Sequence, residues 1–521
     1  MMNRNRWIGV YLLAGIAALV LSYRWQDAPL LSNDGYQYLD AASHFAAGKC
    51  LCVEIAHFDE QVTMGRMPVP FTHFAPGYPL LIAAISRAGA TPEGAGYIVS
   101  ATGFLLTIWL IWELALTLRA KPVVVALLSP LWIFHEAALT YAASVGTDSM
   151  FTAALAGICA LMARDSREDE HRPVFLLALG AVAGSAFWLR YAGLFLLFVA
   201  ALYIVWRAWR SPKTRFYACG ALAIEGLLVA TVLVRNILEA GSWRGGFTSG
   251  GGHSLRFVLT ETAKAVYHLV FGDRAPAGID FWTVLFALAL VAACSAWWKV
   301  QWRSDFNSAA VVWSGILVAA YTAGIMETAL TTIAWSLNRY IVPLYPVVLA
   351  GLAAVFSIPA TRRQVLSVAA MALSVVAVQS RSLSIPPPPA PHLIAAADLQ
   401  QHVESGVSAR QWLLDHVPPS SAVVSVNGQA MHYLLQRPTV SVIEPEDSSN
   451  RMDDTFFHAV MKRFSAHYLV VFPGEKSFAT SPQDSIPFLH GLISGDIPHW
   501  LNRAASTRNT AIFECRDCVA Q

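Results

Sequence analysis

About eleven apolar stretches, each near the length of a membrane-spanning helix, follow one another between residues 7 and 378. A transmembrane helix needs roughly 20 largely apolar residues. Only 13% of the 521 residues are charged, whereas soluble chains carry roughly 25%. The sequence therefore predicts a polytopic α-helical membrane protein. The expected spans are Trp7–Tyr23, Ala95–Leu118, Val123–Tyr141, Ser149–Ala163, Val174–Trp188, Ala192–Trp206, Phe216–Val234, Phe281–Trp298, Ala309–Ile325, Ile341–Ile358 and Val365–Val378.

Arginine and lysine residues gather in alternate short loops between these spans. The positive-inside rule places such loops, and with them the N-terminus, in the cytoplasm. An odd number of spans then puts the C-terminal end outside, in the periplasm of a bacterium with an inner membrane. The basic residues that carry this prediction are Arg4, Arg6, Arg119, Lys121, Arg164, Arg167, Arg172, Arg207, Arg210, Lys213, Arg215, Lys299, Arg303, Arg362 and Arg363.

The sequence divides into a membrane part, a linker and a soluble part. Residues 1–385 form the membrane part, in which residues 24–94 make a long first outer loop. Proline-rich residues 386–394 read as a stiff linker, and residues 395–521 as an outer α/β domain. Its expected strands are Ala422–Val426, Thr439–Ile443, Tyr468–Phe472 and Thr510–Glu514, with helices at Ala409–Asp415, Gln429–Leu435 and Asp454–Phe464.

Five ionisable residues from distant parts of the chain fall at the predicted outer ends of spans: Asp34, Asp148, Arg190, Arg235 and Arg339. Ionisable groups at membrane depth are costly and usually face a bundle interior or a cavity. Arginine forks suit phosphate oxygens, and a neighbouring carboxylate can act as a base toward a hydroxyl. The pattern therefore predicts a phosphate site with an acidic residue beside it.

Each of these residues also has a structural explanation. Arginines at helix ends often extend toward lipid headgroups. Asp34 and Asp148 stand where a helix begins and could cap it. The sequence favours function over capping for Asp34 and leaves the two explanations balanced for Asp148.

Other polar residues are weaker candidates. His73 lies in a turn-rich segment and either faces the site or packs against it. Glu54, His57 and Asp59 could join Asp34 in a metal site, but no fixed ligand spacing supports one, so a divalent metal is left as an open alternative. His135, Glu136 and Glu225 are expected to be structural, and Gly250–Gly252 to be a loop rather than an anion-binding nest.

The cysteines favour disulfides on the outer side. Cys50 and Cys52 lie in the first outer loop, and Cys515 and Cys518 lie near the end of the chain. Disulfides form in such oxidising surroundings. We prefer a structural disulfide for Cys515 and Cys518, either with each other or with Cys50 or Cys52, over a redox or metal site, because no second Cys-x-x-Cys motif or histidine pair accompanies them in the sequence.

Three short motifs resemble a known family. They are Asp34-Gly-Tyr-Gln-Tyr38 with the helix that runs on to Gly48, Pro76-Gly-Tyr-Pro-Leu-Leu81, and Arg339-Tyr-Ile-Val-Pro-Leu-Tyr345. Arg190-Tyr-Ala-Gly193 and Arg235-Asn236 add to the likeness. Over most of residues 1–380 the chain is similar to glycosyltransferases of the GT-C fold that use lipid-phosphate sugars, such as protein O-mannosyltransferases and lipid A aminoarabinose transferases.

The resemblance implies an enzyme that transfers a hexosyl or pentosyl group from a polyprenyl-phosphate donor to a lipid, glycan or protein acceptor. Asp34 takes the place of the family's catalytic base, with Asp148 as a second candidate. Arg190, Arg235 and Arg339 would bind the donor phosphate and stabilise the leaving group, with Tyr38, His73 and Tyr340 also in the substrate site. A single displacement implies inversion. Family members often carry Asp-Glu where this chain has Asp34-Gly35, which leaves the use of a metal open.

Two other classes of function compete with this interpretation. A transporter or flippase for lipid-linked sugars would use the same arginines without breaking a bond, but the sequence shows no convincing internal repeat. A non-catalytic assembly protein would use the outer domain as a binding module. A net charge of +2 gives no support to a nucleic-acid partner.

Overall fold

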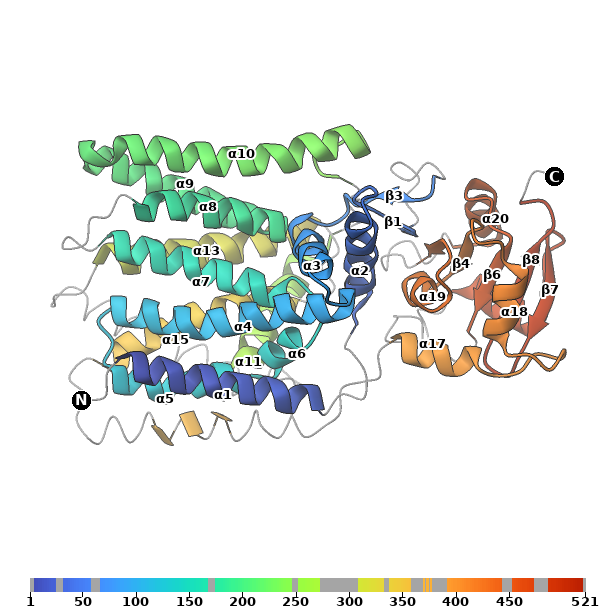
Figure 1. Ribbon diagram of the computed structural model, residues 1–521, viewed down its shortest axis with the longest axis horizontal. Coiled ribbons are helices and arrows are strands. Elements are labelled where there is room, and N and C mark those ends of the chain that lie inside the picture. The colour runs from blue at the N-terminus through green and yellow to red at the C-terminus, as the bar shows by residue number, and fades with distance from the viewer. Residues whose placement is uncertain are drawn as a thin grey trace.

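The computed structural model describes residues 4–24, 31–57, 66–166, 174–245, 252–271, 308–331, 337–357, 369–370, 372–373, 375–376, 391–442, 452–472 and 486–518. A bundle of long helices runs side by side, and a smaller region of strands and short helices lies at one end of the bundle (Figure 1). The bundle contains α1 (Arg4–Arg24), α4 (Pro92–Thr117), α5 (Pro122–Ile133), α6 (Glu136–Ala142), α7 (Asp148–Asp165), α8 (Val174–Leu189), α9 (Gly193–Arg210), α10 (Arg215–Ala240), α11 (Leu255–Phe271), α13 (Ser308–Thr331), α14 (Leu337–Ile341) and α15 (Tyr345–Phe356).

Within the described residues, five helical segments are long and apolar enough to cross a membrane, or six if the bent pair α5–α6 counts as one span. These segments contain α4, α9, α10, α13 and α14–α15, and the shorter helices α1 and α8 are apolar as well. The predicted class, a polytopic helical membrane protein, is confirmed. The expected spans Phe281–Trp298 and Val365–Val378 lie wholly or largely outside the described residues.

One expected span has a different form. Val123–Tyr141 was predicted to be a single helix, but it is broken into α5 and α6, which meet at an angle of 64°. Pro130 lies inside α5, and His135 caps α6 by accepting a hydrogen bond from the backbone N–H of Ala138. A proline near a helix end and a capping side chain together end one helix and start the next.

Glycine lets two helices of the bundle approach closely. A Cβ atom on Gly103 of α4 would lie 2.5 Å from the backbone nitrogen of Met150 in α7. Because no larger residue fits there, the first turn of α7 packs directly on α4. This contact fixes the end of α7 at which Asp148 lies.

The C-terminal part contains a six-stranded sheet in the order β2-β5-β4-β6-β8-β7. The first four strands of this order are parallel, and β8 and β7 are antiparallel to their neighbours. The bounds are β2 (Ile55–His57), β4 (Val423–Ser425), β5 (Thr439–Ser441), β6 (Tyr468–Val471), β7 (Leu501–Ser506) and β8 (Ala511–Cys515), with α17 (Pro391–Leu399), α18 (Ala409–His416), α19 (Gly428–Leu435), α20 (Asp454–Arg463) and α21 (Pro487–Ser494). We call residues 391–518 the sheet region.

Strand β2 comes from the predicted first outer loop, although it pairs with β5 in the sheet. The sheet therefore joins two parts of the chain that the sequence had assigned to different domains. The same loop contributes a small hairpin of β1 (Cys52–Val53) and β3 (Val69–Pro70).

Helix α2 (Asn33–Ala46) stands between the bundle and the sheet region, beside α3 (Gly77–Arg87) (Figure 1). Ser32 caps α2 by accepting a hydrogen bond from the backbone N–H of Gly35. Most of α2 is buried, since it packs on α3, α4 and α19. Its two faces therefore meet two different parts of the molecule.

Candidate functional site

Four charged residues meet at the end of the bundle that carries α2, and we call them the membrane-side cluster: Asp34, Asp148, Arg190 and Arg339. Arg339 donates through Nη1 to Asp34 Oδ2 at 2.6 Å, and through Nε to the two oxygens of Asp148 at 2.9 and 3.0 Å. Arg190 donates through Nη1 to Asp148 Oδ1. The sequence predicted that these residues share one depth, and the structure brings all four into direct contact.

Capping does not explain the two carboxylates. Helix α2 is capped by Ser32, so Asp34 in its first turn is free to face Arg339. The first residue of α7 is Asp148, whose carboxylate binds two arginines instead of the end of its own helix. The capping alternative that the sequence left open is therefore not what the structure shows.

The absence of a second acid next to Asp34 has a steric cause. A Cβ atom on Gly35 would lie 2.9 Å from the backbone carbonyl oxygen of Val145, so a glutamate does not fit without a shift of that loop. The carboxylates of the cluster therefore come from α2 and α7, and both are paired with arginine.

Exposure increases from the inner to the outer part of the membrane-side cluster. The side chain of Asp148 is 4% exposed and that of Arg190 10%, whereas Asp34 and Arg339 are each 24% exposed. Asp148 therefore acts as a buried anchor for two guanidinium groups. Asp34 and one edge of Arg339 are the charged groups that another molecule can reach.

Two tyrosines predicted to lie in the site border the cluster. The guanidinium of Arg190 lies 4.8 Å from the ring centroid of Tyr340, a cation–π arrangement. Tyr38 is buried among Phe71, Phe74 and Tyr78. Burial raises the pKa of its hydroxyl above the ordinary value, and the nearby Asp34 carboxylate raises it further. Tyr38 therefore stays protonated.

Arg235 was grouped with these arginines by the sequence, but it lies elsewhere. Its Nη2 donates to the backbone carbonyls of Phe71 at 2.6 Å and Leu51 at 3.3 Å, next to the β1–β3 hairpin. The contacts it makes hold the first loop. Its Nη1 is buried without a hydrogen-bond partner among the described residues. His73 packs edge-on against Phe74.

Tyr191 and Asn236, which directly follow Arg190 and Arg235, make structural contacts that the sequence did not reveal. The Tyr191 hydroxyl donates to the carbonyl oxygen of Thr72 at 3.0 Å and itself accepts from Asn236 Nδ2 at 3.0 Å. Tyr191, which lies between α8 and α9, and Asn236 of α10 thus hold the segment around Thr72. Only the repetition of a polar residue after each arginine hinted at this.

A second group of charged side chains, which we call the sheet-side cluster, contains Asp40, His44, Glu54 and His432. Asp40 Oδ1 lies 3.1 Å from His44 Nδ1 and 3.3 Å from His432 Nε2, and Asp40 Oδ2 accepts from the Glu54 N–H at 2.6 Å. Burial alone would raise the pKa of Asp40, but its hydrogen bonds with the two histidines lower it to about 2. The sequence offered Glu54 as a possible metal ligand together with Asp34. In the structure Glu54 lies instead beside Asp40 and His44 of α2.

Two further residues, His57 and Asp59, were candidates for a metal site with Asp34. His57 lies in β2, and Asp59 lies outside the described residues. Ligand atoms of His458, Cys515, Asp517 and Cys518 lie within 4.8 Å of one another. The two cysteines are joined in a disulfide, as are Cys50 and Cys52, and a disulfide does not supply the thiolates that bind zinc. Of the pairings that the sequence left open for Cys515 and Cys518, the structure has the one between these two residues, and Cys50 and Cys52 form a second disulfide.

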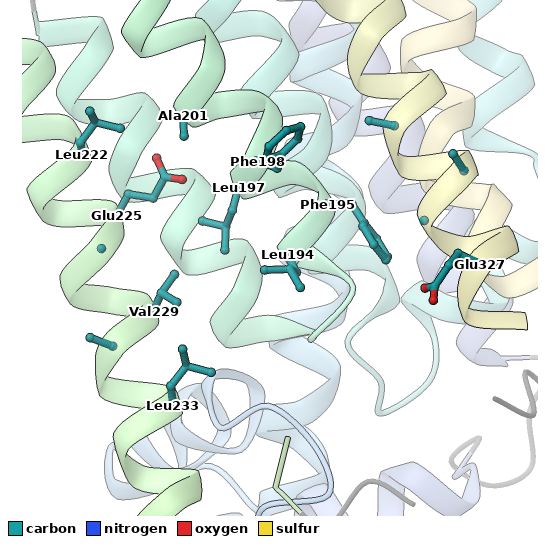
Figure 2. Close-up of a pocket in the computed structure, with 15 residues that line it drawn as sticks. Leu194, Phe195, Leu197, Phe198, Ala201, Leu222, Glu225, Val229, Leu233 and Glu327 are labelled. Atoms are coloured by element: carbon teal, nitrogen blue, oxygen red, sulfur yellow. The ribbon is translucent and has the colours of Figure 1, made fainter. Parts of the chain in front are cut away.

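An apolar groove of about 1000 Å³ lies between α9, α10 and α13 (Figure 2). Leu194 and Phe195 line it at the start of α9, shortly after Arg190, and Glu225 and Gly226 line it on α10. Glu225, which the sequence treated as structural, is buried and its Oε2 has no hydrogen-bond partner among the described residues. The groove thus leads away from the arginine end of the bundle along membrane helices.

The fold and the site define a polytopic membrane protein with an acid–arginine centre at one end of its helix bundle. Residues 73–234 match the family model of dolichyl-phosphate-mannose-protein mannosyltransferases. That range contains Asp148 and Arg190 of the membrane-side cluster, and it ends before Arg339. No curated protein sequence matches the chain significantly.

Solved structures extend the likeness to the whole chain. ArnT from Cupriavidus metallidurans, bound to undecaprenyl phosphate, matches with a TM-score of 0.60 at 14% identity, over 98% of this chain and 99% of that chain. The oligosaccharyltransferase AglB from Archaeoglobus fulgidus matches with a TM-score of 0.53 at 11% identity, over 92% and 72%. The mycobacterial arabinofuranosyltransferase AftD matches with a TM-score of 0.54 at 12% identity, over 100% and 42%. The chain therefore has the GT-C fold, and the resemblance stated from its motifs is confirmed.

Proposed function

We propose that this protein is a membrane glycosyltransferase that moves a sugar from a polyprenyl-phosphate donor to an acceptor at the outer face of the membrane. The observation that carries the proposal is the shared guanidinium of Arg339, which binds the exposed Asp34 and the buried Asp148 together. A base and a phosphate-binding group thus stand side by side, which is the pairing that transfer from a sugar phosphate to a hydroxyl requires.

The cluster suggests how donor binding would prepare the base. Arg339 keeps Nε on Asp148 while its Nη1 holds Asp34. A donor phosphate competes with Asp34 for that outer edge of the guanidinium, since arginine binds phosphate and carboxylate with the same fork. Donor binding would therefore release the Asp34 carboxylate beside the sugar, while Asp148 keeps Arg339 and Arg190 in place.

The reaction would then be a single displacement. Asp34 takes the proton of an acceptor hydroxyl as its oxygen forms a bond to the anomeric carbon. The bond from that carbon to the phosphate oxygen breaks, and the polyprenyl phosphate leaves with its negative charge facing Arg339 and Arg190. Attack opposite the leaving group inverts the anomeric configuration. Arg235 has no part in this scheme, because it is bound to the first loop.

The apolar groove suits the donor's lipid tail. It starts at Leu194, four residues after Arg190, and is lined mainly by apolar side chains of membrane helices, with Glu225 and Glu327 as its two acidic residues. ArnT, a structural neighbour that matches over 98% of this chain, was solved with undecaprenyl phosphate bound. A tail in this groove would place its phosphate near the membrane-side cluster.

The test is transfer by the purified protein in nanodiscs that contain a radiolabelled polyprenyl-phosphate sugar. Gly226 lines the groove and Gly315 of α13 does not, and a Cβ atom on either would meet nothing within 4 Å. Gly226→Leu should fill the groove and weaken donor binding about tenfold or more, because a displaced apolar chain loses its burial. Gly315→Leu is the matched control and should bind donor normally.

Release of free polyprenyl phosphate with a labelled acceptor supports the proposal. Movement of intact labelled donor across the bilayer without bond cleavage would instead support a flippase. Equal donor affinity in both glycine variants would show that the tail lies elsewhere.

A further inference from the structure

Helix α2 carries different chemistry on two faces. Each residue of an α-helix advances about 100° around its axis, so residues four apart share a face. Asp34 and Tyr38 share the face that meets the membrane-side cluster. Tyr36, Asp40 and His44 share a second face, which meets the sheet region. One helix therefore contacts both the membrane-side cluster and the sheet region.

The contact at Asp40 crosses from α2 to α19. The Asp40 side chain is 7% exposed and that of His432 9%. His44 joins the same carboxylate from one turn further along α2, and its Nε2 lies 3.5 Å from Glu54 Oε1. A buried carboxylate needs such partners, because an unpaired buried charge is strongly unfavourable.

Geometry indicates that both histidines are protonated. His432 Nδ1 lies 2.7 Å from the carbonyl oxygen of Arg437, while its Nε2 faces Asp40. His44 Nδ1 faces Asp40, and its Nε2 faces Glu54. A neutral imidazole has only one N–H donor, so two acceptors on one ring require the imidazolium form.

Among the residues that the structure describes, the other contacts of α2 in this area bring no further titrating cation to Asp40. Tyr36 is hydrogen-bonded to His392 of α17 at 2.8 Å. Glu93 of α4 accepts from the Tyr433 hydroxyl at 3.2 Å. Arg87 of α3 donates to the carbonyls of Phe45 and Ala46 at the end of α2.

We propose that His432 and His44, by holding Asp40, make the sheet region fix the position of α2 and of the Asp34 carboxylate during transfer. The inference rests on the proposed function and adds that Asp40, His44 and His432 are positioning residues. The sheet region is thus part of the catalytic apparatus, and its influence falls when the histidines lose their protons.

The sign of the pH effect follows from the pairing. Hydrogen bonding to Asp40 raises the pKa of His44 above 6.5, although burial opposes this effect. Burial lowers the pKa of His432, but the contact with Asp40 raises it by more, so the net shift is upward. A raised histidine pKa gives stability below its unfolded value that is lost as pH rises through the folded value. Asp40, with a pKa of about 2, keeps its charge in this range. We call the contacts of Asp40 with His432 and His44 the clamp. The clamp is therefore complete in mildly acidic solution, where both histidines are charged, and it weakens toward alkaline pH.

The test compares two histidine–aspartate pairs of the sheet region. His432→Gln removes the cation that faces α2, and His458→Gln removes the partner of Asp517, a pair that does not touch α2. Full-length protein is assayed for transfer from pH 6 to 9. His432→Gln should lower kcat about tenfold or more, since small misplacements of a catalytic group have large effects. The KM for donor should stay within about twofold, since donor binding rests on the arginines.

The pH profile separates positioning from a general loss of structure. Wild type should lose kcat as pH rises through the pKa of the two histidines, whereas His432→Gln should start lower and lose less, because only His44 still titrates beside Asp40. His432→Lys keeps a cation and should recover activity at alkaline pH. His458→Gln should keep the wild-type profile. A wild-type profile in His432→Gln, or the same loss in His458→Gln, would overturn the proposal.

Hydrogen exchange of residues 33–46 gives a readout that needs no enzyme activity. His432→Gln should speed exchange in α2 at pH 6, and His458→Gln should not. If exchange changes while wild type transfers no sugar, the proposed function fails and the clamp stands. If wild type transfers sugar and neither exchange nor kcat changes, the clamp fails and the function stands.

Discussion

Two carboxylates on the same helix, Asp34 and Asp40, are paired with different cations. Arg339 holds Asp34 on the membrane side, and His432 and His44 hold Asp40 on the sheet side. Arginine keeps its charge at every relevant pH, whereas histidine changes charge near neutrality. The first cluster is therefore a constant electrostatic centre, and the second is an adjustable support for it.

The two carboxylates of α2 also differ in exposure. The side chain of Asp34 is 24% exposed, as is that of its partner Arg339, while the side chain of Asp40 is 7% exposed. This difference fits a division between a reacting carboxylate and a supporting one. The predictions below test this division.

The largest effect is expected for Asp34→Asn. Asparagine keeps the size of the side chain but removes the basic carboxylate. A positioned general base contributes about 10²–10⁴-fold, so turnover should fall by that order. Donor affinity and protein yield should be kept, because Arg339 and Arg190 are intact. The measurement is kcat with donor affinity by equilibrium binding.

A matched control is Glu261→Gln on α11, which also removes a partly exposed carboxylate paired with a cation, Lys264. It should transfer sugar at the wild-type rate. Near-normal turnover by Asp34→Asn would mean that Asp34 is not the base, and Asp148 or Asp40 would be tested next.

Asp148→Asn should act on stability as well as activity. Asp148 is 3% exposed and lies between two guanidinium groups. Removing one partner of a buried ion pair costs about 3–5 kcal/mol, because the remaining charges are left uncompensated. The free energy of unfolding in detergent should fall at every pH between 6 and 9, since neither arginine titrates there.

Asp165→Asn provides the comparison for Asp148→Asn. Asp165 is equally buried, but it binds Arg207 at 2.5 Å and the Tyr203 hydroxyl at 2.7 Å at the opposite end of the bundle. Its loss should lower stability and leave the kcat of the folded fraction unchanged. A fall of kcat in both variants would remove the special role assigned to the membrane-side cluster.

The sequence predicted the membrane class, most helices and the four members of the membrane-side cluster. It did so because apolar length marks a span and because ionisable residues at span ends stand out against lipid. Arg235 satisfied the same rule but binds the carbonyls of Leu51 and Phe71. Helix-end position fixes depth, whereas the direction of a side chain depends on tertiary packing.

The sheet-side cluster was missed for a different reason. Tyr36, Asp40 and His44 have helical spacing, but nothing in the sequence marks His432 as their neighbour. That contact depends on β2 joining the sheet beside β5, a pairing of segments nearly four hundred positions apart, Ile55 with Thr439. Long-range pairing of a three-residue strand leaves almost no local signal.

The smallest effect is expected for Tyr36→Phe, and it separates charge from simple docking on the sheet side. The Tyr36 hydroxyl pairs with His392 Nδ1 and also accepts from the His392 backbone N–H at 3.1 Å. Burial raises the pKa of Tyr36 and lowers that of His392, so both stay neutral near pH 7. Losing such a neutral hydrogen bond costs about 1 kcal/mol. Hydrogen exchange in residues 391–399 should rise by the same factor at pH 6 and pH 8.5, whereas the effect of His432→Gln on α2 should shrink at the higher pH. An equal pH dependence in both variants would show that the two contacts titrate together, and the contrast between a neutral dock and a charged clamp would be lost.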